Sequence, residues 1–132
     1  MIEAKNRGFG VSKPFGDNER YDLILDGGQR RLWRVQVKSS ASVHHNGFAV
    51  RACWRSSRKH LPYTAALIDF MAVVIQSKRV PERLIWYVIP VRALGGRLTI
   101  NLYPFGGRRD CELRLEKYRD AWGLLGRARR RR

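Results

Sequence analysis

The feature that most constrains the fold is a pair of alternating apolar segments joined through Gly27-Gly28. The first segment is "DLILD", from Asp22 to Asp26, and the second runs from Arg31 to Ser39 and contains "WRVQVKS". Successive side chains of a strand point to opposite faces of its sheet. A glycine pair between two such segments is typical of a hairpin turn. The sequence therefore predicts two neighbouring antiparallel strands.

Alternation gives the second strand two different faces. Trp33, Val35 and Val37 share one face, whose apolar character predicts that it packs on the core. Gln36 and Lys38 share the other face, about 7 Å apart along the strand. Two polar groups at that spacing can address one phosphate, although an ordinary solvated strand face is the simpler interpretation.

The length of the connection decides whether Asp22 joins that polar face. With a two-residue loop, Asp22 would lie opposite Trp33 and point into the core. With a three-residue loop, it would lie opposite Arg34, diagonal to Gln36. A slip of one residue moves every side chain to the other face. A site that combines Asp22 with Gln36 therefore requires an odd connection, or a bulge near Asp22.

The remaining pattern predicts a mixed α/β (α+β) fold with about six strands in one sheet and one or two helices. The segment Phe70 to Gln76 is almost continuously apolar, so we expect a strand buried on both faces. Further elements are expected as follows: helical turns at 1–7 that Gly8 ends, strands at 9–14, 47–53, 84–89 and 97–103, a helical turn at 65–69, and a last helix within 113–125. We expect one domain, 1–126, followed by a basic tail, 127–132.

The charge of the chain points to an anionic partner. The sequence has 27 Lys and Arg against 11 Asp and Glu, a formal charge of +16, and five of the arginines lie in the tail, so the rest still carries +11. Nucleic acid is the first hypothesis and an anionic membrane surface the second. No apolar run approaches the roughly 18 residues of a spanning helix, and the N-terminus lacks an apolar signal core. We therefore expect no membrane association and a cytoplasmic location.

Cysteine and histidine spacing excludes other classes of site. Cys53 and Cys111 stand far apart and form no CxxC pair, and the three histidines show no zinc-ligand spacing. We expect neither a disulfide framework nor a zinc site, and no small-molecule cofactor.

A short motif in the chain resembles that of the PD-(D/E)xK nucleases. In that family an Asp is followed by a hairpin and then by an acid-x-Lys sequence. Here the corresponding residues are Asp22 and, after the hairpin, Gln36-Val37-Lys38. The wider text is similar to the branch that includes group I intron homing endonucleases and small bacterial relatives, in the segments "VSKPFGDNERYDLILD", "LWRVQVKSS", "IDFMAVVI", "WYVIP" and "LEKYRDAW". The resemblance extends from Gly8 to Leu125 and implies a restriction-endonuclease-like sheet.

The resemblance also implies a metal site. Asp22, Gln36 and the backbone carbonyl of Val37 would hold Mg²⁺, for which Mn²⁺ can substitute. Gln36 stands where the family usually has an acid; the branch accepts Gln, but an uncharged amide should hold the metal more weakly. Lys38 would orient or help deprotonate the attacking water and offset charge in the transition state. Glu3 is a weaker candidate ligand, because the family often has a Glu on a preceding helix.

Basic side chains around this motif are candidates for DNA contacts. The simpler interpretation is that these side chains are solvated charges in turns. For Asp69, an acidic residue, we expect a structural role. The candidates are Lys13, Arg20, Arg34, Arg55, Arg58, Lys59, Arg129 and Arg130.

Three functions remain open. The first is a divalent-metal-dependent DNA endonuclease with Asp22, Gln36 and Lys38 as catalytic residues, giving 5′-phosphate and 3′-hydroxyl ends. The second is a nucleic-acid-binding module on a catalytically impaired nuclease fold. The third, a ribosomal-type RNA-binding protein, rests on charge alone. One such chain holds one site, so cutting both DNA strands needs a homodimer or higher oligomer, or two successive nicks.

Overall fold

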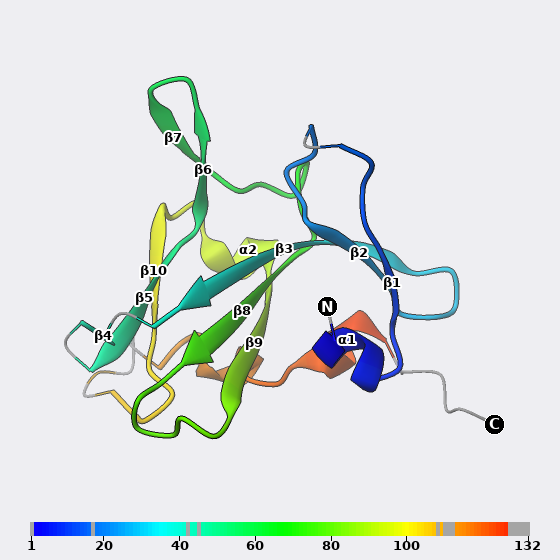
Figure 1. Cartoon of the computed structure of the whole chain (residues 1–132). Helices are drawn as coiled ribbons and strands as arrows, with labels where there is room; N and C mark the ends of the chain where they lie inside the picture. Colours follow the sequence, from blue (N-terminus) through cyan, green and yellow to red (C-terminus); the bar gives the residue numbers. More distant parts are fainter. Residues whose placement is uncertain are drawn as a thin grey trace.

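A mixed five-stranded sheet forms the centre of the molecule (Figure 1). The computed structural model describes residues 2–16, 18–41, 43–44, 46–107, 109 and 113–126. Strands β3 and β8 run parallel, and the other neighbours are antiparallel. In spatial order the strands are β1 (Gly10–Ser12), β2 (Leu23–Asp26), β3 (Leu32–Ser40), β8 (Phe70–Gln76) and β9 (Leu84–Pro90).

Strand β8 is buried on both faces, as its continuous apolar sequence predicted. Phe70 and Ala72 belong to one hydrophobic cluster. Met71, Val73 and Ile75, the alternate residues, belong to the other. The central sheet therefore separates two cores, and each of its faces needs a cover.

The first cover combines segments from both ends of the described chain. Helix α1 (Ile2–Asn6) and the 3₁₀ helix η2 (Trp122–Leu125) contribute Ala4, Trp122 and Leu125 to the cluster that contains Val35 of β3. The helical stretch ends at Gly8, as expected, with φ at 87°. This cover lies on the face opposite Gln36 and Lys38, because Val35 alternates with them along β3.

The second cover is a three-stranded antiparallel sheet in the order β10-β5-β4. Its apolar face contributes Phe48, Val50, Ile100 and Leu102 to the second core. A one-turn helix, α2, links β9 to this sheet. The bounds are β4 (Val43–His44), β5 (Gly47–Arg51), α2 (Val91–Leu94) and β10 (Thr99–Leu102).

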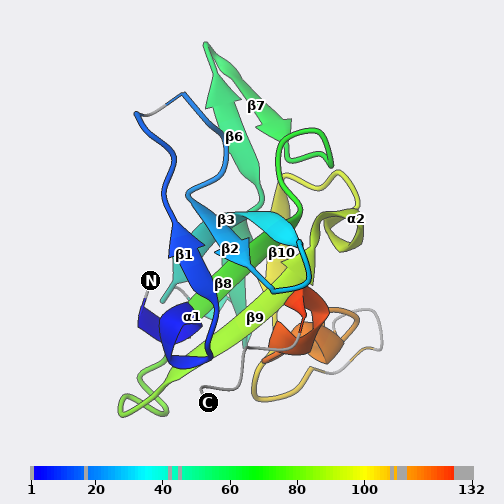
Figure 2. The same cartoon turned by 90° about the vertical axis from the view of Figure 1, so that its right-hand side faces the viewer.

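The basic stretch at 55–60 forms a hairpin that the sequence did not predict. Strands β6 (Cys53–Ser56) and β7 (Lys59–Pro62) pair only with each other within the described residues. The hairpin stands out from the body of the molecule in both views (Figures 1 and 2). With the short β4 it raises the number of strands among the described residues to ten, against the six or so expected.

The predicted last helix is wrong. Two short 3₁₀ helices, η1 (Glu116–Tyr118) and η2, replace it. Between them Arg119 bridges to Tyr87, and Asp120 turns back with φ at 49° while its N–H donates to the carbonyl of Trp86. Pairing with β9 thus uses backbone groups that a continuous helix would need. No helix among the described residues is long and apolar enough to cross a membrane.

Candidate active site

The connection between β2 and β3 brings Asp22 to the polar face of β3. Asp26 pairs with Leu32, so five residues, 27–31, form the loop. The loop has an odd number of residues, as a site that combines Asp22 with Gln36 requires. It is two residues longer than the three-residue loop considered from the sequence. In this register the N–H of Asp22 donates to the carbonyl of Val35 at 2.9 Å, and Asp22 comes beside Gln36.

Asp22, Gln36 and Val37 form one hydrogen-bonded cluster. Oδ2 of Asp22 accepts from Nε2 of Gln36 and from the backbone N–H of Val37, both at 2.9 Å. The same Nε2 donates at 3.4 Å to the carbonyl of Val37. A carboxylate, an amide and a backbone carbonyl therefore share a single small volume at the exposed end of β2.

This donor set suits a hard divalent cation. Carboxylate, amide and carbonyl oxygens are ligands that Mg²⁺ accepts, and in the structure an N–H group of Gln36 bridges the two other oxygens. Turning the amide over would present its oxygen to the same place. No group of three His, Cys, Asp or Glu side chains capable of holding a metal occurs among the described residues; an ion held at Asp22 would therefore also have to use the amide and carbonyl oxygens.

Lys38 lies on the same face of β3 as Gln36 and is half-buried. Its Nζ lies 5.6 Å from the ring centroid of Tyr63. Tyr63 was not singled out from the sequence, because it follows β7, which was itself missed. Strand alternation therefore places Lys38 near the cluster, and a residue from another element contacts it.

A hollow of about 290 Å³ opens beside Asp22. Its lining includes Lys13, one of the expected DNA contacts, and Glu19. Arg20, from the same loop, stacks 4.2 Å over the ring of Trp54 in the hairpin. The loop before β2 thus forms one wall of the candidate site.

The guanidinium of Arg34, one of the DNA-contact candidates, is already bonded to groups inside the protein. Nη1 and Nη2 donate to the carbonyls of Ala66 and Ala65, each at 2.7 Å. Nε and Nη2 donate to the Asp69 carboxylate at 3.2 and 3.0 Å, and the backbone N–H of Arg34 donates to it at 2.8 Å. These bonds use four of the five N–H groups of the guanidinium, and they give Asp69 the structural role expected of it.

The Arg34–Asp69 pair also shifts both pKa values. Burial opposes ionisation of Asp69, but the hydrogen bonds from Arg34 outweigh it and hold the pKa of that carboxyl below its usual range. The hydrogen bonds to Asp69 raise the pKa of Arg34. The pair stays charged and ties the start of β8 to β3.

The structure does not bring Glu3 to Asp22. Its Oε1 accepts from Nε of Arg7 at 2.8 Å, and the Arg7 guanidinium lies 5.0 Å over the ring of Trp122. This group belongs to the cover on the opposite face of the sheet.

The remaining DNA-contact candidates fall into two groups. Arg55, Arg58 and Lys59 are exposed on the protruding hairpin. Arg129 and Arg130, with the rest of the basic tail, lie outside the described residues.

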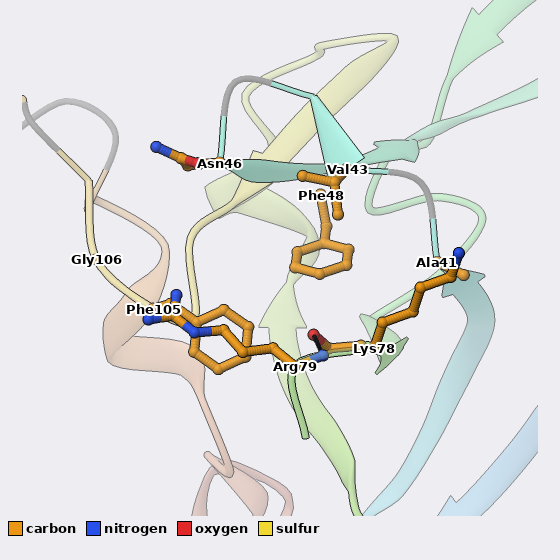
Figure 3. A pocket seen from close by; sticks show the side chains of 9 residues that line it. Ala41, Val43, Asn46, Phe48, Lys78, Arg79, Phe105 and Gly106 are labelled. Carbon is orange, nitrogen blue, oxygen red and sulfur yellow. Dashed lines mark hydrogen bonds between the residues drawn. The ribbon is translucent and has the colours of Figure 1, made fainter. Parts of the chain in front are cut away.

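A larger hollow, of about 540 Å³, lies elsewhere on the molecule (Figure 3). Phe48 and Phe105 line it, with Lys78 beside them and the Arg79 guanidinium 4.6 Å over the ring of Phe105. It contains none of the cluster residues around Asp22. Cavity size therefore does not identify the candidate active site; the convergence of oxygen donors does.

Comparison with known proteins assigns the chain to a family. No curated protein matches it. A solved structure described as that of a bacterial homing endonuclease, I-Ssp6803I, is similar over 94% of this chain and 83% of the other, with 31% sequence identity and a TM-score of 0.73. The family model described as PD-(D/E)XK endonuclease matches residues 1–122. The family model covers nearly the whole chain, and the chain therefore belongs to the PD-(D/E)XK endonuclease family.

Proposed function

We propose that this protein is a divalent-metal-dependent DNA endonuclease whose centre is formed by Asp22, Gln36, Val37 and Lys38. The observation that carries the proposal is the hydrogen-bonded cluster in which Asp22 Oδ2 meets the Gln36 amide and the Val37 backbone. Membership of the endonuclease family and the similarity to a homing endonuclease support it. The strongly basic composition supports a DNA substrate.

Each residue has a distinct part in the proposed site. Asp22, the Gln36 amide oxygen and the Val37 carbonyl would hold Mg²⁺ or Mn²⁺. When bound, such an ion supplies electrostatic stabilisation of the phosphate and helps generate the nucleophile. Lys38 orients the attacking water and places a positive charge where negative charge develops. The chain's own contribution is thus to fix oxygens and an ammonium group around one phosphate.

Substrate DNA would lie across the basic surface near this cluster. Lys13 lines the hollow beside Asp22, and Arg20 lies two residues before it. Arg58 and Lys59 extend from the hairpin. These side chains neutralise phosphates without reading base sequence. Because one chain holds one site, we further propose that double-strand cleavage uses a dimer or two successive nicks.

Cleavage of supercoiled plasmid DNA tests the function. We expect nicked or linear product with Mg²⁺ or Mn²⁺, none with EDTA, and none from Asp22→Ala or Lys38→Ala. Asp26→Ala is the matched control, because Asp26 ends β2, the strand that Asp22 precedes, and its carboxylate accepts from the N–H of Gly28 in the turn; it should cleave. Activity that survives in EDTA, or in both site variants, excludes the proposed centre.

A second candidate is a nucleic-acid-binding module without catalysis. The position of Glu3 favours it, because Glu3 lies with the cover on the opposite face of the sheet and supplies no additional acid to the site. In the same assay this candidate predicts salt-sensitive binding of DNA and no cleavage with either metal.

A further inference from the structure

Tyr63 lies at the base of the protruding hairpin and beneath Lys38. It directly follows β7, is 5% exposed and packs in the second core. The Lys38 ammonium lies 5.6 Å from the ring centroid, within the roughly 6 Å over which an aromatic face attracts a cation. A fixed ring therefore supports a side chain whose stem would otherwise be free to change rotamer.

Charged groups of the candidate centre also act on the phenol of Tyr63. Burial raises the pKa of Tyr63, the negative charge of Asp22 raises it further, and the positive charge of Arg20 lowers it. Tyr63 is thus within electrostatic reach of the carboxylate that Gln36 and Val37 bond. Tyr63 therefore contacts the lysine of the motif, and the charge of the acid acts on its phenol.

A second aromatic residue of the hairpin makes a parallel contact. Trp54 pairs with Leu61 across the hairpin, and the Arg20 guanidinium lies 4.2 Å over its ring. Arg20 precedes Asp22 by two residues. The base of the hairpin therefore contacts both chain segments that form the candidate site, the loop before β2 and strand β3.

We propose that Tyr63 is a positioning residue, whose ring holds the Lys38 ammonium beside the Asp22–Gln36 cluster; the proposal rests on the nuclease function proposed above. The aromatic face performs this role and the hydroxyl is dispensable. Tyr63 exchanges no proton and forms no bond with the substrate. Its contribution is to reduce the freedom of Lys38 before DNA binds.

A series of fluorinated phenylalanines at position 63 tests the role of the ring. Fluorine withdraws charge from the aromatic face and leaves the size of the side chain nearly unchanged, so a merely structural role would not respond. We expect Tyr63→Phe to keep the single-turnover cleavage rate within about twofold. Increasing fluorination should lower that rate by about 3- to 30-fold, while the dissociation constant for DNA in EDTA changes less than twofold.

Tyr63→Leu removes the ring entirely, and Tyr118→Leu is its matched control. Tyr118 makes a similar contact away from the site, with the Lys117 ammonium 5.3 Å from its ring centroid. We expect Tyr63→Leu to lose at least as much rate as the most fluorinated variant, and Tyr118→Leu to cleave like the wild type. A rate that is insensitive to fluorination overturns the proposal.

A readout independent of cleavage separates this proposal from the proposed function. In NMR spectra with labelled lysine, ring currents should shift the ε-methylene protons of Lys38 upfield in the wild type and in Tyr63→Phe, but not in Tyr63→Leu. If the wild type cleaves no DNA, the proposed nuclease function is wrong, but this shift still tests whether the Tyr63 ring holds Lys38 in place. The same Lys38 shift in all three proteins overturns it.

Discussion

At the scale of single residues, three polar side chains of β3 have different fates that local sequence does not distinguish. Arg34, Gln36 and Lys38 alternate on one face, as the pattern predicted. Arg34 nevertheless pairs with Asp69, which is distant in sequence, whereas Gln36 donates to Asp22. Alternation therefore predicts the face of a side chain, but its partner depends on tertiary packing that one strand does not encode.

Replacing Asp69 by Asn tests the structural role of the Arg34 pair. The carboxylate accepts three hydrogen bonds from Arg34, so we expect Asp69→Asn to lower the free energy of unfolding at pH 7 by about 1–3 kcal/mol. Folding lowers the pKa of Asp69. The contribution of the ionised carboxylate to stability is therefore fully present above the pKa of Asp69 in the unfolded chain, near 4. It is lost as the pH falls through the pKa of Asp69 in the folded protein.

Urea unfolding at pH 7, 5 and 3 measures this effect. The gap between wild type and Asp69→Asn should be the same at pH 7 and 5 and should shrink at pH 3. Glu82→Gln, at an exposed position in the β8–β9 turn, should change stability by less than about 0.5 kcal/mol. A gap that does not depend on pH would contradict the role given to the ionised pair.

At the scale of elements, the C-terminal 3₁₀ helix fixes the loop that sets the register of the site. Nε1 of Trp33 donates to the carbonyl of Leu125 at 2.8 Å, and Gly27 packs against the same carbonyl. The sequence predicted the β2–β3 hairpin and the requirement for an odd loop. It could not give the length of five residues, because that length depends on contact with η2.

Gly27→Ala should disrupt this contact. A Cβ at Gly27 would overlap the backbone carbonyl of Leu125, which cannot move as a flexible side chain can. We expect a loss of roughly 2–4 kcal/mol in the free energy of unfolding, as for other cases of overpacking and strain. Gly123→Ala in η2 is the matched control, since a Cβ there meets nothing within 4 Å. Equal stability of the two variants would show that this contact does not hold the loop.

At the scale of the whole molecule, charge is the property that the sequence predicts best. The structure adds little to what the sequence says about it. The excess of basic residues is spread over the body as well as the tail. Its effect is long-range and sequence-independent. What the sequence could not predict is that Arg58 and Lys59 stand on a protruding hairpin, because β6 and β7 are short and lack a glycine turn.

The salt dependence of DNA binding tests how this charge is used. In EDTA, the logarithm of the affinity should fall linearly with the logarithm of the salt concentration, with a slope of about −0.9 per phosphate contact. Arg58→Ala with Lys59→Ala should make the slope shallower by about two. A chain ending at Gly126 should also bind with a shallower slope, yet still cleave at low salt. Unchanged slopes in both proteins would remove these residues from the interface.

The most direct test of the metal centre is the Mg²⁺ dependence of plasmid cleavage by the wild type, Gln36→Glu and Asp22→Ala. A carboxylate at position 36 adds a negative charge to the proposed ligand set, so Gln36→Glu should reach half-maximal cleavage at a Mg²⁺ concentration roughly tenfold lower, or less. Asp22→Ala should not cleave at any concentration. Cleavage by Asp22→Ala with the wild-type Mg²⁺ dependence would contradict a metal centre built on Asp22 and Gln36.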